Sequence, residues 1–237
     1  MKRRQKIALV AVAVLVFYIL LEAELTLPLV GSIKDKPIIL YYNTFNLPIN
    51  TSSFKTVIDF ARSNHFNALM LLVYAYGQAL FNQSEISYFS SFAAKNNITF
   101  VPSYYIVSLE NRINTTGYSW VNLDMEKLSL NLQSSFYAGI ASQVKLVSVT
   151  SPYGQRLPYH PEMNIVETYY ATPVFWYYQL WFDHSAVVCS VSAHSAESQT
   201  AFNAEFNYCL EHSRGVMVFD YWNMIEANLT APNSSVF

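Results

Sequence analysis

The sequence is poor in charged residues and in cysteine, and both shortages exclude classes of protein. Only 13% of its 237 residues are charged, and the net charge of −2 leaves no basic surface for nucleic acid. The spacing of the two cysteines does not indicate a metal site. No H-E-x-x-H or similar ligand spacing involves His160, Asp183, His184 or His194. We therefore expect no nucleic-acid partner, no bound metal and no cofactor.

Apolar and aromatic residues are abundant instead. Hydrophobic residues make up 52% of the chain and aromatic residues 16%, a composition too apolar for disorder. After an N-terminal leader, about 200 residues remain, enough for one domain with its own core, which we place at 31–237. If this domain is exported, a disulfide between Cys189 and Cys209 is one option. Alternatively, Cys189 is an ordinary buried strand residue.

Residues 1–30 have the pattern of a targeting segment. Four basic residues between Lys2 and Lys6 precede the unbroken apolar run Ile7–Leu21. The positive-inside bias keeps the basic cluster in the cytoplasm, so the domain lies outside. We predict an uncleaved signal anchor, a single transmembrane helix that holds the domain at the cell membrane. The alternative is a cleaved signal peptide and a secreted domain, and a buried helix of the domain would give the basic start no role.

Acceptor motifs for N-glycosylation agree with this topology. Six N-x-[ST] sequons without proline are spread from the start of the domain to its end. Most of them fall in predicted loops, which favours an extracellular glycoprotein over chance composition. The acceptor residues are Asn50, Asn82, Asn97, Asn114, Asn228 and Asn233.

Strand-like and helix-like segments alternate along the domain. The apolar runs predict eight strands, at 37–44, 68–74, 98–107, 119–124, 144–149, 164–170, 186–192 and 215–221. Segments with helical spacing predict five helices, at 52–64, 84–95, 126–142, 173–182 and 195–212.

Eight buried strands separated by helices are typical of parallel strands covered on their outer faces. Their number and the domain size predict a small (β/α)8 TIM barrel. The connections after the third and fifth predicted strands lack helices, and little chain remains for an eighth helix. An open doubly wound sheet is therefore the alternative.

The fourth predicted strand carries the strongest candidate site. Barrel enzymes place their chemistry at the C-terminal ends of strands, and side chains alternate between the two faces of a strand. The alternation directs Val121, Leu123 and Met125 toward the helices and directs Asn122, Asp124 and Glu126 into the interior. When two carboxyl groups lie as close as Asp124 and Glu126, the charge of one raises the pKa of the other. One acid of the pair then stays protonated near neutral pH. Glycoside hydrolysis uses such a pair.

A purely structural interpretation competes with this one. If a helix begins at Glu126, Asp124 caps its N-terminus and Glu126 favours its dipole. This interpretation requires no catalysis.

The segment Ser119-x-x-Asn122-x-Asp124-x-Glu126 resembles the D-x-x-D-x-D-x-E signature of family 18 glycoside hydrolases, which include chitinases and endo-N-acetylglucosaminidases. The resemblance implies that Glu126 is the proton donor and that Asp124 positions the substrate's own N-acetyl group as nucleophile. Residues 215–219, Gly-Val-Met-Val-Phe, are similar to the last strand of that family, G-[VI]-M-x-W. Phe219 then stands at the aromatic floor of the sugar site, with Trp222 nearby.

The sequence departs from the family pattern at several points. Ser119 and Asn122 replace two acids, no S-x-G-G occurs on the third strand, and Glu167-Thr-Tyr169 is only loosely similar to the M-x-Y-[DN] of the sixth. D-x-E at a barrel strand end also occurs in other glycosidase clans, including the family 25 lysozymes. Further polar or aromatic residues at strand ends are Asn43, Tyr74, Tyr76, Tyr104, Tyr105, Tyr153 and His194.

The sequence thus predicts an exported barrel that hydrolyses glycosidic bonds of an extracellular glycan. Glu126 and Asp124 are the predicted catalytic residues. The predicted substrate contacts are Asn122, Glu167, Tyr169, Phe219, Asp220 and Trp222. The alternatives are a non-catalytic barrel that binds a glycan or a protein of the cell envelope, and a membrane-bound assembly subunit with a large exposed apolar patch.

Overall fold

The computed structural model describes residues 36–45, 47–110, 112–152, 155, 157–168, 187–194, 196 and 198–232. Within these ranges, no helix is long and apolar enough to cross a membrane. Several predictions lie outside the described residues: the leader 1–30, the helix 173–182, and the side chains of Tyr153, Tyr169, Asp183, His184 and Asn233.

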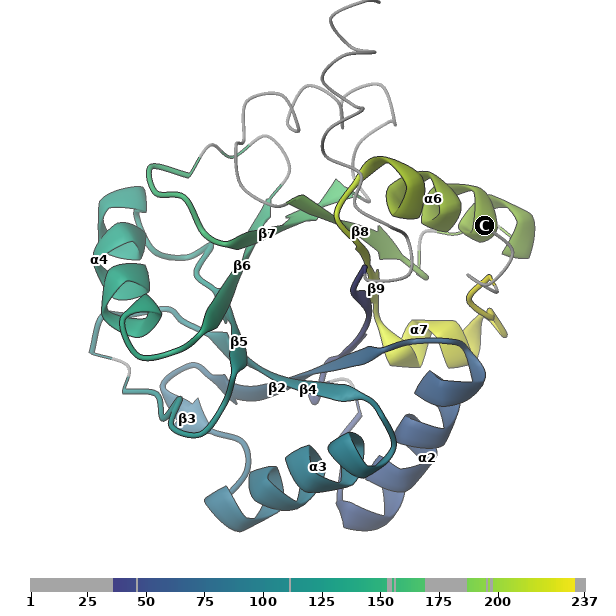
Figure 1. Cartoon of the computed structure of the whole chain (residues 1–237), viewed down its shortest axis with the longest axis horizontal. Helices are drawn as coiled ribbons and strands as arrows, with labels where there is room; N and C mark the ends of the chain where they lie inside the picture. The colour runs from purple at the N-terminus through teal and green to yellow at the C-terminus, as the bar shows by residue number, and fades with distance from the viewer. Residues whose placement is uncertain are drawn as a thin grey trace, which may run out of the picture.

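The described chain alternates strands and helices around one closed sheet (Figure 1). The strands are β1 (Ile38–Tyr42), β2 (Ala68–Ala75), β3 (Gln78–Ala79), β4 (Thr99–Tyr105), β5 (Trp120–Asp124), β6 (Leu146–Pro152), β7 (Met163–Glu167), β8 (Val187–Ser192) and β9 (Val216–Phe219). The helices are α2 (Thr51–Ser63), α3 (Gln83–Lys95), α4 (Leu130–Ala141), α6 (Gln199–His212) and α7 (Tyr221–Glu226).

The sheet closes through β1, which pairs in parallel with both β2 and β9. The other parallel pairs follow the order β2, β4, β5, β6, β7, β8 and β9, so eight parallel strands form a complete barrel. The predicted barrel is therefore confirmed, and the alternative of an open doubly wound sheet is wrong. The short β3 pairs antiparallel with the end of β2 and was not predicted.

A glycine permits the closure at the seam between β9 and β1. A Cβ atom on Gly215 would collide with the backbone oxygen and the ring of Pro37. The neighbouring Val216 N–H donates to that same oxygen at 3.0 Å. Because only glycine lets the two backbones come this close, the first residue of the G-V-M-V-F segment has a structural role in closing the barrel.

The helices begin at residues that the sequence makes good caps. Asn50 accepts backbone N–H bonds at the start of α2, and the Ser53 side chain bonds back to Asn50 N–H. Asn82 and Glu85 form the same reciprocal capping box at α3. These caps place both helices within one residue of their predicted starts.

The largest difference from prediction is the helix expected at 126–142. It begins instead at Leu130, with Ser129 at the N-cap, and ends at Ala141. Within this helix, Leu132 is 40% exposed while Gln133 is buried. The short helix α7, for which little chain seemed available, follows β9 directly. The described residues of the connections after β4 and β6 contain no helix, as predicted.

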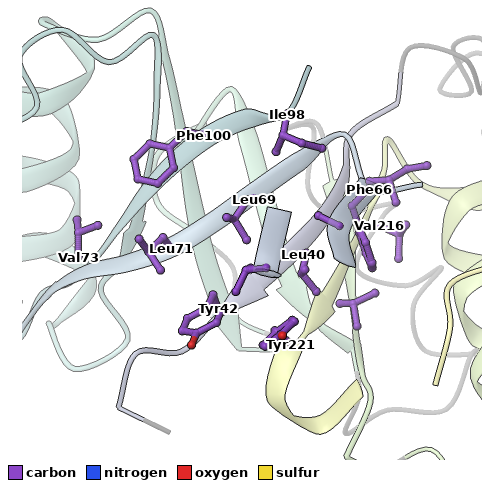
Figure 2. Close-up of a cluster of buried hydrophobic side chains, with 14 of the residues drawn as sticks. Leu40, Tyr42, Phe66, Leu69, Leu71, Val73, Ile98, Phe100, Val216 and Tyr221 are labelled. Carbon is purple, nitrogen blue, oxygen red and sulfur yellow. The ribbon is translucent and has the colours of Figure 1, made fainter. Parts of the chain in front are cut away.

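The main hydrophobic core fills the layer between the barrel and its helices. Phe54 of α2 is fully buried and stacks on Phe89 of α3, with ring centroids 4.4 Å apart. Figure 2 shows part of this layer, where side chains from β1, β2, β4 and β9 gather with Tyr221 of α7. The outward faces of the strands and the inward faces of the helices therefore share one continuous apolar layer.

The barrel interior has a different composition. Its apolar members, among them Ile39, Met70, Val101, Ile165 and Met217, form a smaller and separate cluster. Alternate positions of β4, β5, β6 and β8 add buried polar side chains to it. These are Ser103, Asn122, Ser148, Thr150 and Ser190.

The two cysteines are both buried and both free. Cys189 lies on β8 and Cys209 on α6, and their thiols are hydrogen-bonded to each other. Burial, followed by the neighbouring Cys189, raises the pKa of the Cys209 thiol. The sequence allowed a disulfide between Cys189 and Cys209, and in the structure both thiols are free.

Candidate active site

The alternation predicted for the fourth strand is confirmed in β5. Val121, Leu123 and Met125 are fully buried in the layer under the helices. Asn122 and Asp124 pair in register with Ser103 and Tyr105 of β4, whose side chains also face the interior. The strand therefore brings its polar side chains into the barrel and leaves Asp124 at the C-terminal mouth.

Asn122 lies one layer below the mouth and is fully buried. Its Nδ2 donates to Ser103 Oγ and to Thr150 Oγ1, each at 3.0 Å. Its Oδ1 accepts from Ser148 Oγ at 2.9 Å. The amide thus makes a satisfied network with the barrel's own hydroxyls. Its predicted contact with substrate stays a prediction.

Asp124 does not cap a helix, because α4 starts six residues after it. Its carboxylate instead accepts the backbone N–H of Glu126. The prediction that Asp124 caps a helix is therefore wrong. The segment forms a turn that holds the two acids next to each other at the mouth.

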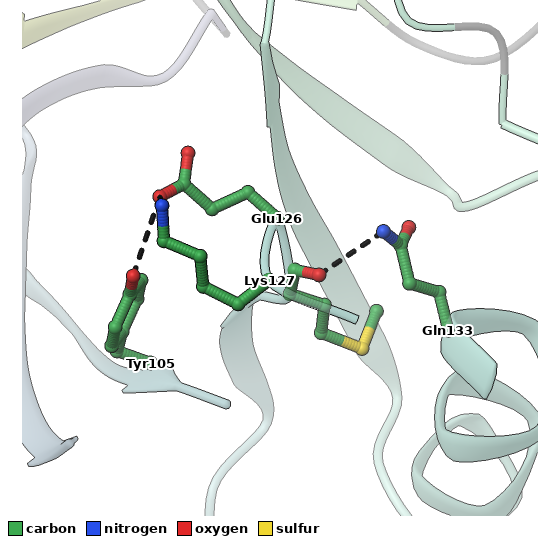
Figure 3. A network of polar contacts seen from close by, with 5 residues as sticks. Tyr105, Glu126, Lys127 and Gln133 are labelled. Carbon is green, nitrogen blue, oxygen red and sulfur yellow. Dashed lines mark hydrogen bonds and ion pairs between the residues drawn. The ribbon is translucent and has the colours of Figure 1, made fainter. Parts of the chain in front are cut away.

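Gln133 of α4 fixes this turn from below. Its Nε2 donates to the carbonyl oxygens of Met125 and Leu128 at 3.0 and 2.9 Å, and its Oε1 accepts from Tyr159 Oη at 3.2 Å. Figure 3 shows this amide reaching the backbone beneath Glu126. Sequence reasoning missed Gln133, and its only signal was a polar residue inside an apolar helix.

Glu126 lies at the rim with its side chain 31% exposed. Its Oε1 accepts from Tyr105 Oη at 3.3 Å and lies 3.4 Å from Lys127 Nζ (Figure 3). Tyr105 comes from the neighbouring strand β4, so the carboxylate is held by two different strand ends. A partly exposed acid in this position can reach a molecule bound at the mouth.

The electrostatic environment raises the pKa of Asp124 to about 8. Burial is the main cause, and the carboxylates of Glu126 and Glu167 add to it. The bond from Glu126 N–H and the charge of Lys127 act in the opposite direction. Near neutral pH, Asp124 therefore retains a proton, and an acid that is protonated at this pH can take part in general acid catalysis.

Two more acids and a tyrosine complete the mouth. Glu167 ends β7 and Asp220 follows β9, and both lie close enough to Tyr41 to raise the pKa of its hydroxyl, after burial and Asp124. The Tyr41 hydroxyl is hydrogen-bonded to Ser103, and its ring stacks on Phe219 with centroids 5.1 Å apart. Tyr41 was not predicted as a site residue, because it appears in the sequence only as part of an apolar strand.

Asp220 also has a structural role, and the other predicted residues lie farther from the acids. Asp220 is buried and its Oδ1 accepts Asn223 N–H at 3.0 Å, which makes it the N-cap of α7. The peptide between Phe219 and Asp220 is cis. Trp222 is the second residue of α7 and half-buried, whereas His194 is exposed. Tyr74 and Tyr104 belong to the outer core. The described residues contain no group of three or more acids, histidines or cysteines suited to a metal.

The fold and the mouth define a TIM barrel with a carboxyl pair at the end of one strand. No protein-family model and no curated protein matches the chain in sequence. Solved structures do resemble it in fold. The GH18 chitinase ChiB of Flavobacterium johnsoniae is 11% identical with a TM-score of 0.52, over 79% of this chain and 88% of the chitinase chain.

A second solved structure is the spore cortex-lytic enzyme SleL of Bacillus cereus. It is 9% identical with a TM-score of 0.56, over 83% of this chain and 75% of the enzyme chain. An HpcH/HpaI aldolase from Desulfitobacterium hafniense DCB-2 is 7% identical with a TM-score of 0.49, over 81% of this chain and 89% of that chain. At such identities the likeness to the chitinase and to SleL establishes the barrel fold.

Proposed function

We propose that the protein is a glycoside hydrolase in which Glu126 is the general acid and Asp124 its partner. The observation that carries this proposal is the position of Asp124. Its carboxyl lies at the C-terminal mouth next to Glu126, burial raises its pKa to about 8, and it caps no helix among the described residues. A strongly perturbed acid in this position is typical of a catalytic site.

The proposed reaction uses the substrate's N-acetyl group. Glu126 gives its proton to the glycosidic oxygen while the bond from that oxygen to the anomeric carbon breaks. The acetamido oxygen of the sugar forms the new bond to the anomeric carbon, and Asp124 hydrogen-bonds the acetamido nitrogen. Water then attacks the anomeric carbon while the bond from that carbon to the acetamido oxygen breaks. The water gives a proton to Glu126, so that the acetamido group and both carboxyl groups are restored.

The proposed substrate is a polymer that contains N-acetylglucosamine. The resemblance of residues 119–126 to the family 18 signature supports it, since that chemistry needs an N-acetyl group. A similar fold in a chitinase agrees with it. Phe219, stacked on Tyr41 in the barrel mouth, would provide the aromatic floor for the sugar, and Glu167, Tyr169, Asp220 and Trp222 remain proposed contacts.

The test compares the wild-type chain with Glu126→Gln on a panel of N-acetylglucosamine polymers and N-glycans, with release of reducing sugar as the readout. We expect the amide to lower kcat by a factor on the order of 10²–10⁴, because it cannot give up a proton. Glu226→Gln, a change at an exposed glutamate that ends α7, is the matched control and should retain full activity. Equal turnover by wild type and Glu126→Gln would refute the assignment.

A non-catalytic, glycan-binding barrel is the second candidate. It is favoured by Asn122, which replaces an acid of the family signature and is fully engaged by Ser103, Ser148 and Thr150. If neither protein hydrolyses any substrate but both bind a glycan, this second function is the correct one, and Asp124 and Glu126 are then structural.

We also propose that the domain is exported, held at the membrane by residues 1–30, and N-glycosylated. All five described sequon asparagines are exposed. The serine or threonine two positions after each of them is exposed as well. Expression in a eukaryotic secretory pathway followed by glycosidase treatment tests this. A mass unchanged by the treatment would contradict it.

A further inference from the structure

Two of the most exposed aromatic side chains stand together at the C-terminal end of the barrel. Phe45 is 52% exposed and follows β1, and Tyr76 is 64% exposed and follows β2. Their ring centroids are 5.7 Å apart. Large aromatic rings in mutual contact on a surface leave apolar area in water that a ligand can cover.

This pair continues toward the candidate active site. Tyr76 meets Tyr105 edge-on, with ring centroids 5.2 Å apart, and the Tyr105 hydroxyl donates to Glu126. The residues come from the ends of β1, β2, β4 and β5, which are consecutive around the barrel. Phe45, Tyr76 and Tyr105 therefore form one row that ends at the proposed acid, and we call it the aromatic row.

Ordered turns present the row. Thr44 Oγ1 donates to the carbonyl oxygen of Leu72 at 3.0 Å, and Asn43 Oδ1 accepts Phe45 N–H at 3.1 Å. Tyr76 adopts a φ of 50°, in the left-handed region that non-glycine residues rarely occupy, at the turn between β2 and β3. This backbone conformation is unfavourable for a residue with a side chain, so the surrounding fold holds Tyr76 in it against the local preference.

We propose that the aromatic row is a binding subsite for the sugar rings of a glycan chain that extends from Glu126 across β4, β2 and β1. Aromatic faces pack against the C–H faces of pyranose rings, and the hydroxyl of an exposed tyrosine such as Tyr76 can hydrogen-bond sugar hydroxyls. The proposal rests on the proposed function for its ligand, an N-acetylglucosamine oligomer. It assigns Phe45 and Tyr76 to the recognition of long substrates.

The test measures binding rather than turnover. Calorimetric titration with the N-acetylglucosamine dimer and hexamer uses the whole chain carrying Glu126→Gln, so that no ligand is consumed. For the chain that carries only Glu126→Gln, we expect the hexamer to bind at least 10-fold more tightly than the dimer. Phe45→Ala and Tyr76→Ala should each remove most of this preference. Tyr88→Ala changes a 40% exposed tyrosine of α3 that stacks on Phe92, and this control should leave the preference intact.

Side-chain chemistry provides the second comparison. Tyr76→Trp keeps an aromatic face and should keep the hexamer preference, whereas Tyr76→Leu keeps the apolar bulk and should lose it. A hexamer preference that survives both alanine variants would overturn the proposal, and so would equal binding of dimer and hexamer. The proposed hydrolysis could fail in its own assay while these titrations succeed, so the two failures are distinguishable.

Discussion

The two faces of the barrel wall are built from the same strands but differ in composition. Outward-facing side chains meet the helices in a large layer of aliphatic and aromatic residues, as at Phe54 and Phe89. Inward-facing side chains form a smaller apolar cluster, a polar band around Asn122, and acids at the mouth. One residue of register separates the two environments along every strand.

This difference indicates that the outward face mainly stabilises the fold and that the inward face carries the groups suited to chemistry. The outer layer buries most of the apolar area and should contribute most of the stability. The lumen places hydroxyls, an amide and carboxyls where burial is costly unless each one is paired. Asp124, with its raised pKa, is one residue at which that cost is not fully offset. The predictions below test whether stability and chemistry separate in this way.

The largest effect on stability is expected in the outer layer. Phe54→Ala removes a fully buried ring that contacts Phe89, Phe92 and Phe100, and should lower the free energy of unfolding by about 3–5 kcal/mol. Urea unfolding followed by circular dichroism measures it. Under conditions where the variant is still folded, its kcat on a glycan substrate should stay close to wild type. A loss below about 1 kcal/mol would show that the outer layer is not the main source of stability.

A smaller effect is expected within the polar band of the lumen. Asn122→Ala leaves Ser103, Ser148 and Thr150 without their shared partner and should cost about 1–3 kcal/mol. Ser190→Ala is the matched change, because Ser190 Oγ is buried without a hydrogen-bond partner among the described residues. Its removal should be neutral or should stabilise by up to about 1 kcal/mol. The same unfolding titration compares the two, and equal losses would contradict the role of the network.

The last predicted effect is on the pH dependence of the free energy of unfolding, and it comes from Asp124. The folded chain keeps a proton on Asp124 up to about pH 8, whereas the unfolded chain releases it near its ordinary pKa of about 4. Between these values the folded state binds more protons, so this group makes stability fall as pH rises. Asp124→Asn cannot ionise and should therefore gain up to about 5 kcal/mol over wild type at pH 8, but almost nothing at pH 4.

Thermal unfolding at both pH values checks this, with Asp59→Asn at an exposed position of α2 as the control. A gain of the same size at pH 4 and pH 8 would mean that ionisation of Asp124 is not its cause.

The pattern of apolar residues was sufficient to predict the barrel, the eight strands and the inward or outward direction of the β5 side chains. Burial on both faces makes parallel strands continuous apolar runs, and the two-residue period then fixes which side chains share a face. The caps Asn50 and Asn82 determined two helix starts for the same local reason. The start of α4 could not be predicted this way, because Glu126 to Leu128 also fit a first helical turn.

Local sequence was therefore sufficient to predict the fold and to identify Asp124 and Glu126 as candidate site residues. Only the tertiary structure decided that these residues form a turn, since Gln133 holds the carbonyls of Met125 and Leu128 from a different element. It also brought Tyr41, Glu167 and Asp220 to the same mouth and aligned Phe45, Tyr76 and Tyr105 along its rim. Such contacts join residues far apart in the chain, and barrel closure alone sets the distances between them.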